Sequence, residues 1–286
     1  MIHNRNRPTS TLQSLLEQAH VTPPRTWDEL CADGPHFTQR GIIPFAVPVG
    51  ATGGLGGAQG LGEFFLSSML PGNQGGYFKP DGTIAFSREA FIQAATTIKD
   101  LFTRCKITPM QSLQLGINEV HDGFRAGKVA MTVYGLYRFR TIQDQGAGED
   151  LAWAPAPTEA PDSKLTVYGY QIALNAFSNK KDAGWRLLRF MISPEAEAIA
   201  AEGGEVVSRA SAYSADYFKS PAAANQKQWA ELIHSRGREV QYTPILTTFH
   251  QIVGDAFQRM ILANQTPETA YDEVVKAYNT ALAKSR

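Results

Sequence analysis

The chain has 286 residues, with 27 basic and 27 acidic side chains, and neither sign forms a long run. This balance argues against nucleic acid as a partner and suits an uncharged polar ligand. The length exceeds that of most single compact cores, so we expect two lobes or one large domain. No stretch approaches the roughly 18 consecutive apolar residues of a transmembrane helix.

The beginning of the chain, MIHNRNRPTS, is polar and basic. It has no apolar core and no small-residue cleavage site after it, so the sequence predicts no secretory signal here. The two cysteines, Cys31 and Cys105, form neither a CxxC motif nor a zinc-ligand spacing. We therefore favour two thiols over a structural disulfide and keep the disulfide as the alternative.

Three segments in the first third of the chain have clear local signals. Thr26 precedes Glu29 by three residues, the spacing of a capping box, so a helix is predicted to begin there. Glycine and proline dominate residues 41–62, which indicates a loop that closely approaches another segment or moves, or else a loose surface loop. Ser87 is predicted to cap a helix that ends near Arg104 and carries its apolar residues on one face.

Strands and helices alternate further along the chain. Strand-like runs start at Val129, Leu151 and Thr166, and helices are predicted from about Lys181 and from Ser193. Two apolar stripes at helical spacing follow, namely Ile245, Leu246, Phe249, Ile252, Val253, Ala256, Phe257, Met260 and Ile261, and then Tyr271, Val274, Val275, Tyr278 and Leu282. The pattern predicts an α/β arrangement with some parallel strands and a helical tail over one face.

The sequence carries no motif of a nucleotide-dependent or metal-dependent enzyme. Lys128 is followed by Val129, so there is no phosphate-binding loop, and the glycines of residues 53–62 miss the dinucleotide-binding register. The histidines show no metal-ligand spacing, and they are His3, His20, His36, His121, His234 and His250. A dispersed carboxylate pair, as in glycosidases, needs no motif and stays open. We expect a protein without catalytic activity, cofactor or metal.

Aromatic, glycine and arginine residues gather near predicted strand ends and loops. The side chains concerned are Tyr134, Tyr137, Tyr168, Tyr170, Arg209 and Tyr213. Tyrosine rings can stack on the C–H faces of a sugar, while hydroxyls, backbone groups and an arginine fork bind its polar rim. The alternative is that each ring belongs to the core or to the plain surface. Their grouping beside glycines favours a binding site.

Several stretches follow one another in a characteristic order: VTPPRTWDEL from Val21, FRAGKVAMTVYGLY from Phe124 and SNKKDAGWRLLRFMISPEAE from Ser178. Together with GGEVVSRASAY from Gly203 and the segment 244–253, they resemble the family 1 extracellular solute-binding proteins of ABC importers. These are the carbohydrate-type relatives of maltose-binding protein. The resemblance covers nearly the whole chain.

The resemblance implies a type II periplasmic-binding-protein-like fold, in which two α/β lobes close through hinge strands on a solute in the cleft between them. It further implies capture of a sugar, a polyol or a similar solute, and delivery to the membrane permease subunits of an ABC importer. A periplasmic or extracytoplasmic location follows from the same resemblance. The mechanism would be reversible binding rather than catalysis.

Carried over position by position, the resemblance also implies ligand contacts. Tyr137, the last residue of FRAGKVAMTVYGLY, stands where relatives place a sugar-stacking aromatic ring. The run YGY at 168–170 matches a loop at which the chain re-enters the first lobe. His250 stands where maltose-type relatives carry a stacking tryptophan, and this departure argues against a malto-oligosaccharide ligand. The predicted contacts are Tyr137, Tyr168, Gly169, Tyr170, Arg209 and His250.

Family members have a long further segment before the TWDEL-like stretch, which holds most of the sheet of the first lobe. The resemblance therefore divides the chain into 1–160, the first part of a nearly complete second lobe, 161–204, a fragment of the first lobe, and 205–286, the helical end of the second lobe. The fragment is expected to expose an unpaired strand, TVYGYQIALN, and the apolar LLRFM face. We expect a truncated or split family member, or one whose first lobe comes from a separate chain. The alternative is an interaction or remnant protein without ligand binding of its own.

Overall fold

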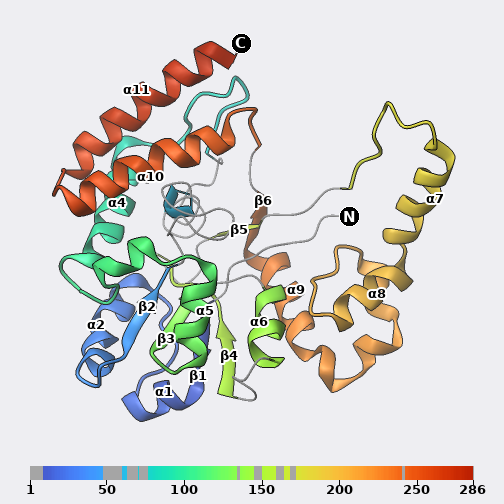
Figure 1. Ribbon diagram of the computed structural model, residues 1–286, viewed down its shortest axis with the longest axis horizontal. Helices are drawn as coiled ribbons and strands as arrows, with labels where there is room; N and C mark the ends of the chain where they lie inside the picture. Colours follow the sequence, from blue (N-terminus) through green and yellow to red (C-terminus); the bar gives the residue numbers. More distant parts are fainter. Residues whose placement is uncertain are drawn as a thin grey trace.

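A four-stranded sheet lies in the larger part of the molecule (Figure 1). The structure, a computed structural model, describes residues 9–47, 60–62, 70, 77–133, 136–144, 150–158, 164–167, 172–239 and 242–285. The strands run in the order β2-β3-β1-β4, and they are β1 (Thr9–Leu12), β2 (Ile43–Ala46), β3 (Val129–Val133) and β4 (Leu151–Ala154). β1 is antiparallel to β3 and β4, whereas β2 is parallel to β3. The predicted strands from Val129 and Leu151 are thus confirmed, and β1 was not predicted.

Helices surround this sheet and form most of the rest of the molecule. They are α1 (Gln13–Ala19), α2 (Trp27–Thr38), α4 (Arg88–Phe102), α5 (Ile117–Arg125), α6 (Leu136–Ile142), α7 (Lys181–Met191), α8 (Pro194–Glu202), α9 (Ala224–Arg236), α10 (Leu246–Leu262) and α11 (Pro267–Ser285). Short 3₁₀ helices occupy Met110–Gln114, Ala210–Ser214, Asp216–Lys219 and Pro221–Ala223.

Side-chain caps fix the starts of three helices and confirm the predicted positions. The Thr26 hydroxyl accepts from the Glu29 N–H at 3.2 Å, and the Glu29 carboxylate accepts from the Thr26 N–H at 3.3 Å, so the capping box is complete. The Ser87 hydroxyl accepts from the Ala90 N–H at 3.1 Å at the start of α4. Ser193 caps α8 in the same way. Each cap satisfies a backbone donor that has no partner inside its helix.

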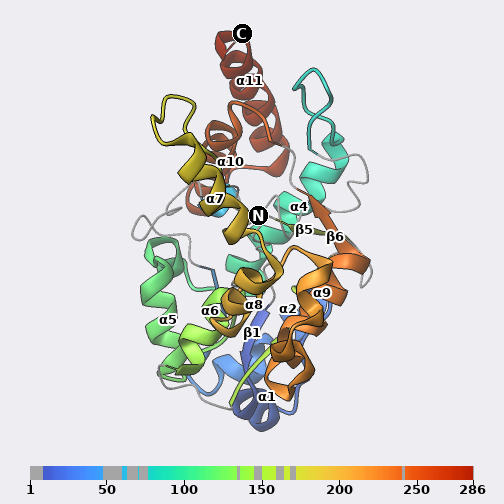
Figure 2. The same cartoon turned by 90° about the vertical axis from the view of Figure 1, so that its right-hand side faces the viewer.

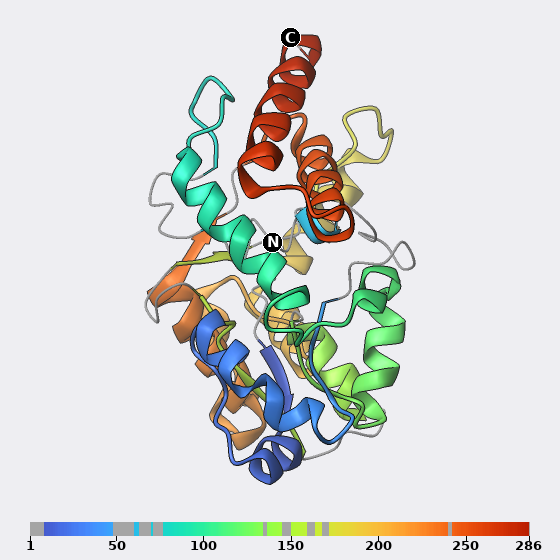
Figure 3. The same cartoon turned by 90° about the vertical axis from the view of Figure 1, so that its left-hand side faces the viewer.

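The main core lies where α4, α10 and α11 pack together, and Figure 3 shows these helices side by side. Phe78 stacks on Tyr278 with 5.4 Å between ring centroids and meets Phe249 edge-on at 5.0 Å. The Tyr278 hydroxyl donates to the Gly82 carbonyl at 2.5 Å, which joins α11 to the turn before α4. The predicted apolar stripe of α10 is confirmed, since its buried members are Phe249, Val253, Ala256, Phe257, Met260 and Ile261.

Two smaller apolar clusters complete the packing. One gathers side chains of α5, α6 and α9, including Phe124, Phe139 and Trp229. The other joins Ala201 of α8 to apolar residues between 207 and 223. The segment after α8 therefore packs against α8 itself.

Cys31 and Cys105 form a disulfide, so the preference for two thiols was wrong. Their Cα atoms are 5.2 Å apart, although 74 positions separate them along the chain. The two segments meet because α2 carries Gly34, where an added Cβ would lie only 2.2 Å from the Ile107 side chain. A spacing rule cannot reveal this pairing, because tertiary packing brings the two cysteines together.

A separate pair of parallel strands links the two sides of the molecule in Figure 1: β5 (Leu165–Val167) and β6 (Gly237–Glu239). The strand predicted from Thr166 is confirmed in this part, whereas the expectation that it lacks a partner was wrong here. An added Cβ at Gly237 would lie 2.9 Å from Val167, so glycine permits the close approach. Between β5 and β6 the chain forms α7, α8 and α9.

α7 stands away from the sheet, and Figure 2 shows it on the side facing the viewer. None of its described residues is buried. Trp185, Leu187 and Phe190 are 57%, 58% and 58% exposed, and Phe177 before the helix is 96% exposed. The expected exposure of the LLRFM face is therefore confirmed. Leu187 and Phe190 are three positions apart and lie on one side of the helix, and we call this pair the α7 apolar face.

Candidate functional site

Tyr137 is the second residue of α6, which begins three positions after the buried strand β3 ends. Ligands of α/β proteins commonly bind beyond the carboxyl ends of parallel strands, and β3 is parallel to β2. The backbone position of Tyr137 suits that location, but its side chain lies outside the described residues. Tyr168, Gly169 and Tyr170 directly follow β5 and also lie outside them. Their roles as ligand contacts stay predictions.

Arg209 lies in a segment that a buried carboxylate holds in place. Glu197 of α8 is only 2% exposed. Its carboxylate accepts from the N–H groups of Ser208 and Arg209 at 3.0 and 2.9 Å, and from the Ser208 hydroxyl at 2.9 Å. Three donors satisfy the buried charge, as burial requires. The Arg209 side chain is exposed, so a fixed backbone presents it to solvent.

Tyr213 lies beside this carboxylate in the 3₁₀ helix Ala210–Ser214. Burial and, second, the charge of Glu197 raise the pKa of the Tyr213 phenol from 10.0 to about 12. The ring packs on Phe218 with 4.6 Å between centroids. Tyr213 therefore stays neutral over the physiological range, and its ring serves the apolar cluster after α8.

His250 lies inside α10 and is 5% exposed. Its backbone carbonyl is covered by the end of the glycine-rich segment. A Cβ added to Gly62 would lie 2.0 Å from the His250 oxygen and 3.1 Å from the Gly254 nitrogen. The close-approach interpretation of this segment is therefore confirmed at Gly62. Contact between His250 and a ligand stays a prediction.

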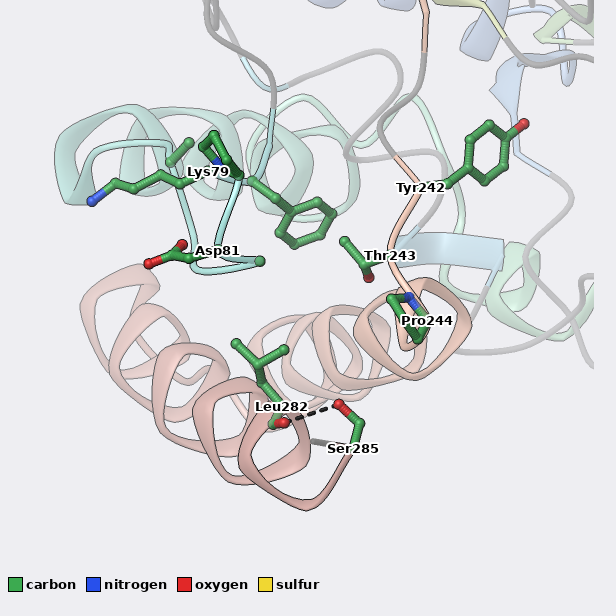
Figure 4. A pocket seen from close by; sticks show the side chains of 11 residues that line it. Lys79, Asp81, Tyr242, Thr243, Pro244, Leu282 and Ser285 are labelled. Carbon is green, nitrogen blue, oxygen red and sulfur yellow. Dashed lines mark hydrogen bonds between the residues drawn. The ribbon is translucent and has the colours of Figure 1, made fainter.

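A cavity of about 720 Å³ opens between the turn before α4, the segment that leads into α10, and the end of α11 (Figure 4). Phe78, Ala85, Pro244 and Leu282 give it apolar walls. In Figure 4 the Lys79 and Asp81 side chains extend to one side of the cavity, while Tyr242 points away from it. The volume is typical of a small-molecule site.

Of the six predicted contacts, Arg209 and His250 are the two whose side chains the structure describes. Neither of these two lines the cavity of Figure 4, the groove between α10 and α11 or the pocket at Asp182, Trp185, Arg186 and Arg189. Sequence reasoning also missed Glu197, one of three glutamates in the alanine-rich helix α8, and the segment Tyr242–Pro244. The only sequence signal near the cavity is the run Pro80, Asp81 and Gly82, which is typical of a turn.

Within the described ranges, no group of three or more His, Cys, Asp and Glu side chains could hold a metal ion. No described helix combines the length and the apolar character needed to cross a bilayer.

The fold defines the class: it is a type II periplasmic-binding fold, matched by solved sugar-binding proteins at TM-scores near 0.8. The chain belongs to the family of bacterial extracellular solute-binding proteins, whose family model matches residues 11–198. This confirms the resemblance drawn from the sequence motifs.

Individual relatives are distant in sequence. A probable amino-acid ABC transporter periplasmic-binding protein of Sinorhizobium fredii is 22% identical over 260 residues, covering 88% of this chain and 56% of that protein. The chain thus spans little more than half the length of this curated relative.

Solved structures give the same picture of the fold. Maltose-bound MalE3 of T. maritima has a TM-score of 0.80 at 20% identity, and the match covers 98% of this chain and 71% of the MalE3 chain. The GacH receptor of Streptomyces glaucescens has a TM-score of 0.80 at 20% identity, and the match covers 99% of this chain and 70% of the GacH chain. A solute-binding protein of Thermotoga lettingae with bound tagatose reaches 0.76 at 21% identity, with 98% and 71% covered. At such identities the likeness establishes the fold.

Proposed function

We propose that this chain is the solute-binding component of an ABC importer and that it captures a sugar or sugar-like solute without catalysing a reaction. The observation that carries the proposal is the family match over residues 11–198. Solved neighbours with bound maltose, laminaribiose and tagatose favour a sugar. The relative named for amino acids makes an amino acid the second candidate.

Capture would proceed by closure of two lobes about the crossing strands β5 and β6. A solute shifts an open and closed equilibrium only if it binds the closed state more tightly, so it must contact both sides. We assign Tyr137 to one side and the loop 168–170, directly after β5, to the other. Arg209, held by Glu197, would add a charged fork for the polar rim of the solute.

An extracytoplasmic location is supported by the disulfide as well as by the family. Structural disulfides persist in oxidising compartments and are rare in the reducing cytosol of most organisms. The bond between Cys31 and Cys105 leaves neither cysteine as a free thiol. Delivery of the solute to permease subunits belongs to the same proposal.

The α7 apolar face indicates that further protein covers it in the functional state. Large exposed patches of this kind mark interaction surfaces. The solved relatives are longer than this chain, which covers about 71% of their length. We propose that a first lobe, on the same or on a separate polypeptide, packs on this face. The rival is an interaction protein that binds no solute alone. Light scattering after size exclusion tests this, and a cooperatively melting monomer without dye-binding apolar surface would contradict it.

A thermal-shift screen tests the solute itself, with maltose, laminaribiose, tagatose, polyols and amino acids as probes. Binding to the folded state raises the melting temperature, and the shift grows with the logarithm of the ligand concentration above Kd. We expect a shift without product formation, and Tyr137→Ala should abolish it while leaving the melting of the free protein nearly unchanged. Turnover would indicate an enzyme, and no response would favour the interaction protein.

A further inference from the structure

The described residues that line the cavity of about 720 Å³ in Figure 4 fall within 78–85, 242–244 and 282–285. Eleven described residues of this chain line it. Neither Arg209 nor His250 is among them. We therefore treat it as separate from the proposed solute site.

The charged side chains that line the cavity do not favour a charged ligand. Lys79 and Asp81 have opposite signs and stand two positions apart on the same turn. The Asp81 carboxylate is also engaged, because it accepts from the N–H and the hydroxyl of Thr83 at 2.9 and 2.6 Å. With walls of Phe78 and Leu282, the cavity favours a neutral and largely apolar molecule.

One polar group in the wall stands out. The Thr243 hydroxyl is shielded from water and has no hydrogen-bond partner in the part of the chain that the structure describes. The Ser285 hydroxyl, by contrast, already donates to the Leu282 carbonyl at 2.9 Å. A buried hydroxyl without a partner is unfavourable, and Thr243 is one of the residues that line the cavity.

We propose that this cavity is a second binding site, which takes a small neutral molecule with an apolar ring and one hydroxyl group. The ring packs between Phe78 and Leu282, and the hydroxyl bonds to Thr243. The site is distinct from the proposed solute cleft and does not depend on it.

Fluorine NMR titration with 4-fluorophenol tests the site, with fluorobenzene as the matched probe that lacks the hydroxyl. We expect saturable binding of 4-fluorophenol and weaker binding of fluorobenzene. Thr243→Val keeps the side-chain shape and removes the hydroxyl. It should weaken the binding of 4-fluorophenol by about 3- to 10-fold and leave the binding of fluorobenzene unchanged. Thr243→Ser should retain the preference for the phenol.

Two filling variants locate the binding. Ala85→Phe inside the cavity and Ser285→Trp at its exposed rim should each abolish binding, and the second keeps the test valid if the first fails to fold. Ala277→Phe, in the separate groove between α10 and α11, should have no effect. The proposal would be overturned if the unmodified protein showed no saturable binding. It would also be overturned if both filling variants bound 4-fluorophenol as tightly as the unmodified protein does. The solute screen plays no part here, so either proposal can fail alone.

Discussion

The Glu197 carboxylate accepts hydrogen bonds from both the backbone N–H and the hydroxyl of Ser208, at 3.0 and 2.9 Å. Because the Glu197 side chain is 2% exposed, Glu197→Ala would remove a buried acceptor, and the donors of Ser208 and Arg209 would lose this partner. We expect a loss of about 1–3 kcal/mol in the free energy of unfolding, measured in urea. Glu202→Ala, at the exposed end of the same helix, is the matched control and should change little. Equal stability of the two variants would show that the clamp does not hold the segment.

Gly62→Ala tests the close contact with α10. The new Cβ would lie 2.0 Å from the His250 carbonyl oxygen, and backbone cannot yield as a side chain does. We expect destabilisation by about 2–3 kcal/mol, measured by chemical denaturation. Gly123→Ala is the control, because its Cβ would lie 3.1 Å from a Val129 methyl group, which can shift. If Gly62→Ala left the free energy of unfolding unchanged, the segment around Gly62 would not pack against α10.

Reduction of the disulfide should lower the melting temperature. A bond that closes a loop over 74 positions stabilises by about 4 kcal/mol in the chain-entropy account. Melting with and without reductant measures the difference, and the variant with both Cys31→Ser and Cys105→Ser should match the reduced protein. Titration of two free thiols in the native, unreduced protein would contradict the bond.

High pH should weaken the fold through Tyr213. Its pKa is about 12 in the folded protein, above the ordinary value of 10.0, so the folded state holds the phenolic proton more tightly than the unfolded state does. This contribution is fully present below about pH 10 and is lost as the pH rises toward 12. Urea unfolding of the unmodified protein and of Tyr213→Phe across this range gives the comparison. The variant should lose less stability, and parallel pH profiles would exclude the effect.

Charged substitutions on the α7 apolar face should leave the fold intact. Leu187→Lys and Phe190→Lys replace side chains that are each 58% exposed, so stability should change by no more than about 0.5 kcal/mol. Binding of an apolar dye should fall, and so should any self-association seen by light scattering. Val253→Lys, in the buried stripe of α10, is the contrasting control and should prevent folding.

Local signals were sufficient for much of the architecture. The Thr26 capping box, the Ser87 cap and the stripe from Phe249 to Ile261 depend on neighbouring residues, and the structure confirms all of them. Family motifs added the type II fold, which the comparisons bear out.

Features that depend on distant residues could not be predicted in this way. β1 is a polar run that becomes a strand because β3 and β4 flank it. Glu197 meets Ser208 only because the chain turns back after α8, and the cavity draws on three separate segments. Of the candidate ligand contacts, Arg209 and His250 can be placed with their surroundings, whereas the solute itself has no local signature.

The disulfide also fixes how the chain responds to proteolysis. Cys31 and Cys105 enclose the whole glycine-rich segment 41–62. A single cut anywhere between the two cysteines would leave both pieces covalently joined. Such a nicked protein would migrate as one chain until it is reduced, and α2 would stay attached to the helical core that begins at α4.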